Sequence, residues 1–71
     1  MERQPIADST SVKSMGYDRT ARVLEVEYAS GRIYDYENVP LEVIVALSEA
    51  ESVGSFLAKN IKFKYEYTEV K

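Results

Sequence analysis

The sequence predicts an α+β domain in which an antiparallel sheet of three or four strands packs against two short helices, in the order ββ(β)αα(β). Over residues 21–29 apolar and polar side chains alternate, which is the pattern of a strand with one face on the core. Over residues 41–50 apolar side chains recur every third or fourth position, which indicates a helix with one apolar stripe. Because the strands precede the helices, the two kinds of element are expected to be segregated.

The first part of the chain is expected to form an antiparallel meander. Ser30-Gly31 is a two-residue hairpin signal, since glycine tolerates a positive φ angle. Asp18 can accept hydrogen bonds from the backbone amides that follow it, which predicts a turn one hairpin earlier. The strands between these turns are predicted at residues 11–18, 21–29 and 32–36.

Two helices are expected next. Asn38 is the predicted N-cap of the first helix, and Pro40 suits its first turn because the missing N–H has no helical partner there. Ser52 is the predicted cap of a second, short helix that continues through Asn60. Capping is favoured over the alternative that Ser52 to Ser55 forms an anion-binding nest.

Residues 62–67 are predicted to be a last strand that returns to the sheet. Phe63, Tyr65 and Tyr67 alternate there with lysine and glutamate, so an inward aromatic face and an outward basic face are expected.

The composition excludes several classes of function. The 71 residues include no cysteine and no histidine, which removes disulfides, the usual zinc ligands, thiol nucleophiles and histidine bases. A chain this short is also expected to enclose hardly any pocket of the usual ~300 Å³. Glu25 and Glu27 share one strand face, but no cleft or third partner supports an acid–base role. We therefore expect a non-enzymatic protein without a cofactor or metal.

Length and hydropathy predict one cytoplasmic, monomeric domain over residues 11–70, after a flexible tail at residues 1–10. No apolar run approaches the ~18 residues of a membrane span, and the N-terminus lacks the apolar core of a signal peptide. The net charge of −3 argues mildly against nonspecific nucleic-acid binding. The basic residues are uneven, however, and four lysines lie within residues 51–71.

Aromatic and basic side chains are the candidates for a binding surface. Tyr34 and Tyr36 could stack on nucleotide bases from an uncovered sheet face. They could instead pack under the helices with their hydroxyls bonded at the domain edge, and this is favoured because so small a domain needs large aromatics in its core. Phosphate contacts would come from basic side chains. The candidate nucleic-acid-binding residues are Arg32, Tyr34, Tyr36, Lys59, Lys62 and Lys64.

Three segments resemble the KTSC family of small bacterial domains, in the family's order. They are the opening strand and turn of residues 14–28, the Ser-Gly, Tyr-x-Tyr and Val-Pro series of residues 30–40, and the Ser-x-Gly-x-aromatic turn of residues 52–56 with its following Ile-Lys pair and late tyrosine. The similarity covers residues 11–70 and implies the α+β fold. Two departures stand out: Leu57-Ala58 replaces a common aromatic-Asn pair, and the acid Asp35 lies between the two tyrosines.

The family is named after its occurrence at the C-terminus of some lysyl-tRNA synthetases, so the resemblance implies an RNA-binding module acting on tRNA or single-stranded RNA. The two departures weaken that implication. The alternative is a protein-interaction module, which the net acidity favours and which could accept a peptide on an edge strand or between the helices.

Overall fold

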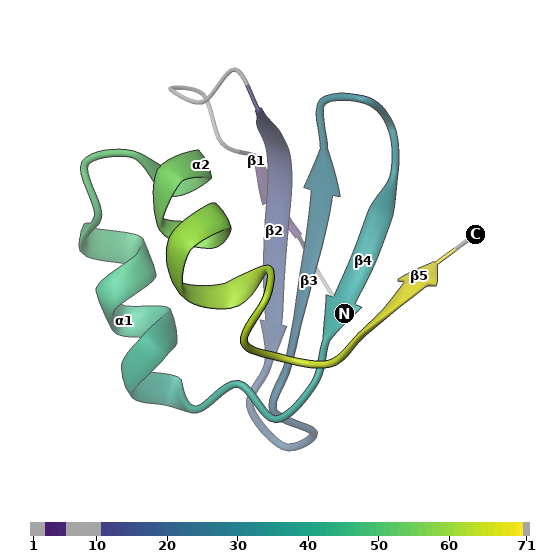
Figure 1. Ribbon diagram of the computed structural model, residues 1–71. Helices are drawn as coiled ribbons and strands as arrows, with labels where there is room; N and C mark the ends of the chain where they lie inside the picture. The colour runs from purple at the N-terminus through teal and green to yellow at the C-terminus, as the bar shows by residue number, and fades with distance from the viewer. Residues whose placement is uncertain (1–2, 6–10, 71) are drawn as a thin grey trace.

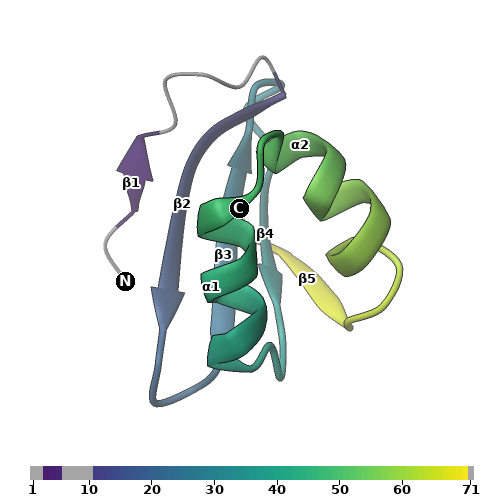
Figure 2. The same cartoon turned by 90° about the vertical axis from the view of Figure 1, so that its left-hand side faces the viewer.

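A five-stranded antiparallel sheet carries the helices on one face (Figures 1 and 2). The computed structural model describes residues 3–5 and 11–70. The strands follow the chain in the order β1-β2-β3-β4-β5, so the sheet is a simple meander with the helices inserted before its last strand. This architecture confirms the α+β prediction. The elements are β1 (Gln4–Pro5), β2 (Val12–Asp18), β3 (Val23–Tyr28), β4 (Ile33–Tyr36), α1 (Leu41–Glu49), α2 (Val53–Phe56), the π-helical turn η1 (Leu57–Ile61) and β5 (Tyr67–Val70).

Both predicted hairpin turns are present. The Asp18 carboxylate accepts the backbone N–H groups of Thr20 at 3.0 Å and Ala21 at 3.1 Å, which closes the β2–β3 turn. Gly31 has a φ of 94°, the positive value that the β3–β4 hairpin requires.

The strand that the sequence did not predict is the two-residue β1, whose Gln4 and Pro5 pair with Met15 and Ser14. These two residues belong to the stretch expected to be a flexible tail. Most of that tail, residues 1–2 and 6–10, lies outside the described residues.

The caps of the helices differ from each other. The backbone N–H of Ser55 donates to the Ser52 hydroxyl at 3.3 Å, so Ser52 caps α2 as expected. Asn38 does not cap α1. Pro40 is the N-cap residue, without a side-chain hydrogen bond, and Asn38 instead has a φ of 58°. The left-handed backbone at Asn38 lies between β4 and α1. Asparagine adopts this conformation more readily than most other residues.

The core lies between the helices and the inner face of β2, β3 and β4. Leu24 and Val26 project inward from β3, as their alternation predicted, and are at most 2% exposed. Leu47 from the apolar stripe of α1 is also buried there. The fully buried set is Val12, Leu24, Val26, Tyr36, Val39, Leu47, Leu57 and Ile61.

The predicted last strand at residues 62–67 is wrong in position. The chain continues from η1 into a turn, because the N–H groups of Lys64 and Tyr65 donate to the Ile61 carbonyl at 3.1 and 3.2 Å. Side chains do not alternate in such a turn, so the expected inward aromatic face does not form. Phe63 is 87% exposed, Tyr67 is 57% exposed and only Tyr65 is half-buried. In the described part of the chain, none of the helices is long and apolar enough to cross a membrane.

Candidate functional site

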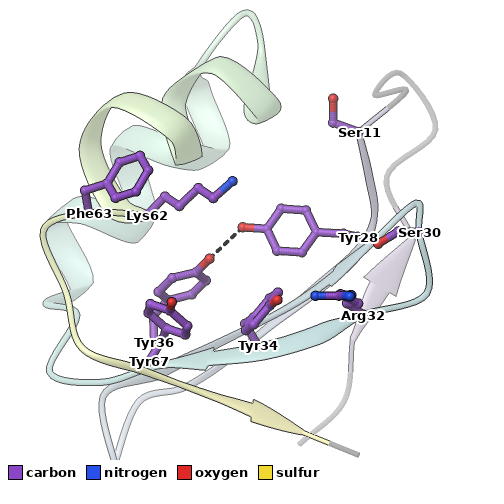
Figure 3. A pocket seen from close by; sticks show the side chains of 9 residues that line it. All are labelled: Ser11, Tyr28, Ser30, Arg32, Tyr34, Tyr36, Lys62, Phe63 and Tyr67. Atoms are coloured by element: carbon purple, nitrogen blue, oxygen red, sulfur yellow. Dashed lines mark hydrogen bonds between the residues drawn. The ribbon is translucent and has the colours of Figure 1, made fainter.

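A pocket of about 360 Å³ lies between the inner face of the sheet and the turn that follows η1 (Figure 3). The expectation that so short a chain encloses hardly any pocket is therefore wrong. Strand β5 runs away from the helical layer (Figure 1), and its Tyr67, which lines the pocket, is 57% exposed. The lining residues are Ser11, Tyr28, Ser30, Arg32, Tyr34, Tyr36, Lys62, Phe63 and Tyr67; the four tyrosines among them are named here the tyrosine floor.

The tyrosine floor is one connected cluster of rings. Tyr34 lies at its centre, with its ring centroid 5.6 Å from that of Tyr28 and 5.3 Å from that of Tyr67, both edge to face. Tyr36 completes the cluster at centroid distances of 6.4 Å from Tyr34 and 5.8 Å from Tyr67. The rings support one another laterally, so the pocket has a preformed aromatic surface.

Two hydroxyls meet inside this cluster. The phenol oxygens of Tyr28 and Tyr36 lie 2.6 Å apart and share a hydrogen bond. Burial raises the pKa of both phenols above the ordinary tyrosine value, and the hydrogen bond to Tyr28 raises that of Tyr36 further. Both hydroxyls therefore stay protonated at neutral pH and act as hydrogen-bonding groups, not as bases.

Two cations flank the floor (Figure 3). Arg32 comes from the start of β4, and hydrogen bonding to Tyr34 followed by the charge of Glu69 raises the pKa of its guanidinium. Lys62 comes from the helical side, directly after η1. Its backbone N–H donates to the Leu57 carbonyl at 2.7 Å, and this π-type turn widens the helix end from which the side chain projects.

Four of the six candidate binding residues meet in this pocket: Arg32, Tyr34, Tyr36 and Lys62. Lys64 lines a shallower neighbouring hollow beside Glu37 and Glu66, and the exposed Lys59 lies on η1 outside both hollows. The two predicted tyrosines differ in burial. Tyr36 is 2% exposed and packs in the core, whereas Tyr34 is half-buried and lines the pocket.

Sequence reasoning missed Tyr28, Phe63 and Tyr67 as pocket residues. A signal existed for Tyr28, because the Ser30-Gly31 hairpin pairs Val26 with Tyr34 and so brings Tyr28 beside Tyr34 on one face. No local signal placed Tyr67, since its pairing with Tyr36 depends on where the chain turns after η1.

The opposite face of the sheet carries an ionic cluster. The guanidinium nitrogens of Arg3 lie 3.3 Å from Oε1 of Glu25 and 3.9 Å from Oε1 of Glu27. The Ser14 hydroxyl donates to the same Glu27 oxygen at 2.9 Å. These partners occupy the two carboxylates on which an acid–base pair would depend. Among the described residues, no group of three or more metal-ligating side chains is placed to hold an ion.

Asp35 lies on the same face of the sheet as this cluster. It pairs with Glu25 across β3 and β4, and its Oδ1 atom is buried without a hydrogen-bond partner in the part of the chain that the structure describes. Burial, and then a proton shared with Glu25, raise the pKa of Asp35 to about 6. A shared proton would also satisfy the Oδ1 atom, which a charged pair leaves without a donor.

Replacing Asp35 by asparagine is therefore expected to stabilise the protein at neutral pH. Because its folded-state pKa lies above the unfolded value of 3.8, Asp35 lowers the free energy of unfolding as the pH rises from 3.8 to about 6. With solvent screening taken into account, Asp35→Asn should gain about 1 kcal/mol at pH 7.5 and little at pH 4. Urea unfolding at both pH values measures this, with Glu42→Gln on α1 as the exposed control. Equal pH dependence in Asp35→Asn and the parent would contradict the assignment.

The KTSC domain family model matches residues 8–65 of the chain. The chain belongs to the KTSC domain family. The crystal structure of a KTSC domain protein from Yersinia pestis superposes with a TM-score of 0.91 and 32% sequence identity, covering 99% of this chain and 97% of that one. The fold and the family expected from the three sequence segments are thus both confirmed.

Relatives of this KTSC domain include free-standing and larger proteins. An uncharacterised protein of Stutzerimonas stutzeri is 54% identical over 46 residues, which is 65% of each chain. A lysine–tRNA ligase of Trichormus variabilis is 35% identical over 63 residues, and one of Nostoc is 41% identical over 61 residues. This chain spans only 11% of the length of either ligase, so the likeness concerns one segment of them.

Proposed function

We propose that this KTSC domain is a non-catalytic module that binds single-stranded RNA, including unpaired parts of tRNA, in the tyrosine pocket. The observation that carries the proposal is a preformed aromatic floor open to solvent and flanked by Arg32 and Lys62. Aromatic rings stack on unpaired bases, and lysine and arginine engage phosphates. Lys59 and Lys64, outside the pocket, are proposed to add weaker attraction to the strand.

The pocket chemistry favours binding over catalysis. Its lining contains hydroxyls, rings and cations but no carboxylate among the described residues, and the phenols of Tyr28 and Tyr36 hold their protons. The likeness to a segment of lysine–tRNA ligases supports a nucleic-acid ligand, because a small domain appended to such an enzyme is well placed to contact tRNA. The acidic net charge of −3 fits local rather than extended phosphate contact.

Replacing Lys62 by alanine tests the phosphate contact. Labelled poly-U and tRNA are titrated with the protein at a series of salt concentrations, and anisotropy gives the affinity. Each lost phosphate contact on a single strand should reduce the salt slope by about 0.7, so Lys62→Ala should show a shallower slope and weaker binding. Lys64→Ala should weaken binding less.

Lys13→Ala is the matched control, because Lys13 is an exposed lysine of the bulged strand β2 and lies 4.0 Å from Glu27 of the ionic cluster. It should leave the affinity and the slope unchanged. Absence of RNA binding by the parent protein at low salt and micromolar concentration would end the proposal. A response of amide chemical shifts to added protein partners, without any response to RNA, would favour the interaction module instead.

A further inference from the structure

We infer that the pocket holds a single unstacked nucleotide, with its base between Phe63 and the tyrosine floor and its flanking phosphates on Arg32 and Lys62. This inference rests on the proposed function and narrows its ligand to one nucleotide unit. It predicts that a free nucleoside monophosphate, and not only a long strand, binds this protein.

The size of the pocket limits how large a part of a nucleic acid it can hold. A volume of about 360 Å³ is at the lower end of the range for small-molecule sites, roughly 300–1,000 Å³. That volume is sufficient for one nucleotide unit. A strand lying on an open sheet would instead need a broad flat surface with successive rings exposed.

Phe63 adds an exposed aromatic ring to the pocket. Its side chain is 87% exposed although it lines the pocket mouth, so it contributes little to the core. Within the described residues no ring contact joins it to the tyrosines, which leaves a gap between Phe63 and the floor. The hydrogen bond from the Lys64 N–H to the Ile61 carbonyl at 3.1 Å fixes the turn that presents it. A base entering the pocket would meet the tyrosine floor and, at the mouth, the exposed ring of Phe63.

Two cationic side chains, Arg32 and Lys62, line the pocket from different elements. Arg32 projects from the sheet and Lys62 from the helical side, and the floor lies between them (Figure 3). The Lys62 ammonium lies 5.9 Å from the centroid of the Phe63 ring, so charge and ring are presented together. Every internal nucleotide carries a phosphate on its 5′ side and another on its 3′ side. Cations on two sides of one aromatic slot match that arrangement.

A tryptophan at position 63 gives a direct measurement. The protein contains no tryptophan, so Phe63→Trp introduces one fluorophore at the pocket mouth. Uridine 5′-monophosphate should quench its emission saturably, and uridine should bind at least about tenfold more weakly because it lacks the phosphate. Inorganic phosphate should compete only weakly, because it makes no stacking contact.

Phe63→Ala gives a second measurement that does not depend on fluorescence. It should lower the affinity for poly-U about tenfold, since one stacking partner is lost, while the melting temperature stays within a degree or two of the parent. Leu41→Ala on α1 is the control for removal of an exposed apolar side chain, and it should change neither quantity.

The outcomes separate the inference from the function on which it rests. If poly-U binds in a Lys62-dependent way but the monophosphate causes no quenching and Phe63→Ala binds normally, the one-nucleotide pocket is wrong and the RNA-binding module stands. If inorganic phosphate competes as well as the monophosphate, the base makes no contribution and the inference is again overturned. If neither poly-U nor the monophosphate binds, both proposals fail.

Discussion

Replacing Tyr36 by alanine is expected to lower the free energy of unfolding by a large fraction of its total. The Tyr36 side chain is 2% exposed and lies in the core between β4 and the helices. Truncating a buried aromatic residue typically costs about 3–5 kcal/mol, because the lost contacts leave a cavity. A domain of this length has a total stability of roughly 4–10 kcal/mol, so one such change removes between about a third and all of it. Circular dichroism during urea unfolding measures the loss.

Tyr67 provides the matched control for this experiment. It pairs directly with Tyr36 across β4 and β5 and belongs to the same ring cluster, but it is 57% exposed. Tyr67→Ala should cost less, about 1–2 kcal/mol, because less apolar area leaves a buried environment. Tyr36→Phe separates the hydroxyl from the ring and should cost about 1 kcal/mol, since the Tyr28 hydroxyl loses its partner. Equal losses for Tyr36→Ala and Tyr67→Ala would contradict the division of the cluster into core and pocket.

Replacing Tyr34 by leucine is expected to weaken RNA binding by about 1–3 kcal/mol, which corresponds to a factor of roughly 5 to 150. Tyr34 lies at the centre of the tyrosine floor and is half-buried. Leucine keeps much of the packing volume against the core but offers no flat π-face to a base. Anisotropy titration of poly-U gives the affinity, and a parallel thermal melt shows whether the fold is intact.

Tyr34→Phe distinguishes stacking from the other roles of this side chain. Phenylalanine retains the ring and should keep most of the affinity. Normal RNA affinity in Tyr34→Leu, together with weakened binding in Lys62→Ala, would mean that the protein holds phosphates without stacking a base.

One face of the sheet carries both the core and the pocket. Where the helices cover the inner face, Leu24, Val26 and Leu47 build the core. Where β5 diverges from the helices, the same face presents aromatic side chains to solvent. Tyr36 belongs to both parts, since its ring is buried and its hydroxyl reaches Tyr28 at the pocket. A domain with few residues can therefore keep a core and still offer a preformed aromatic surface.

Local patterns in the sequence were sufficient for most of the fold. Alternation in residues 21–29 identified β3 and its inward side chains, and the hairpin at Gly31 set the pairing with β4. The apolar stripe of residues 41–50 identified α1. These features succeed because backbone geometry ties side-chain direction to short, regular spacings that are visible within one element.

The pocket and the outer-face cluster depended on contacts between distant segments. The alternating residues 62–67 suggested a strand, but hydrogen bonds to the Ile61 carbonyl turn the backbone there and expose Phe63. Burial, and then the Glu25 carboxyl that the sheet register sets opposite, raise the pKa of Asp35, and register is not visible in either strand alone. The sequence by itself determined β2, β3, β4 and the two helices, the core face and the supply of tyrosines and lysines. Only the tertiary structure decided which of them meet, because the gap between β5 and the helices results from packing many residues apart in the chain.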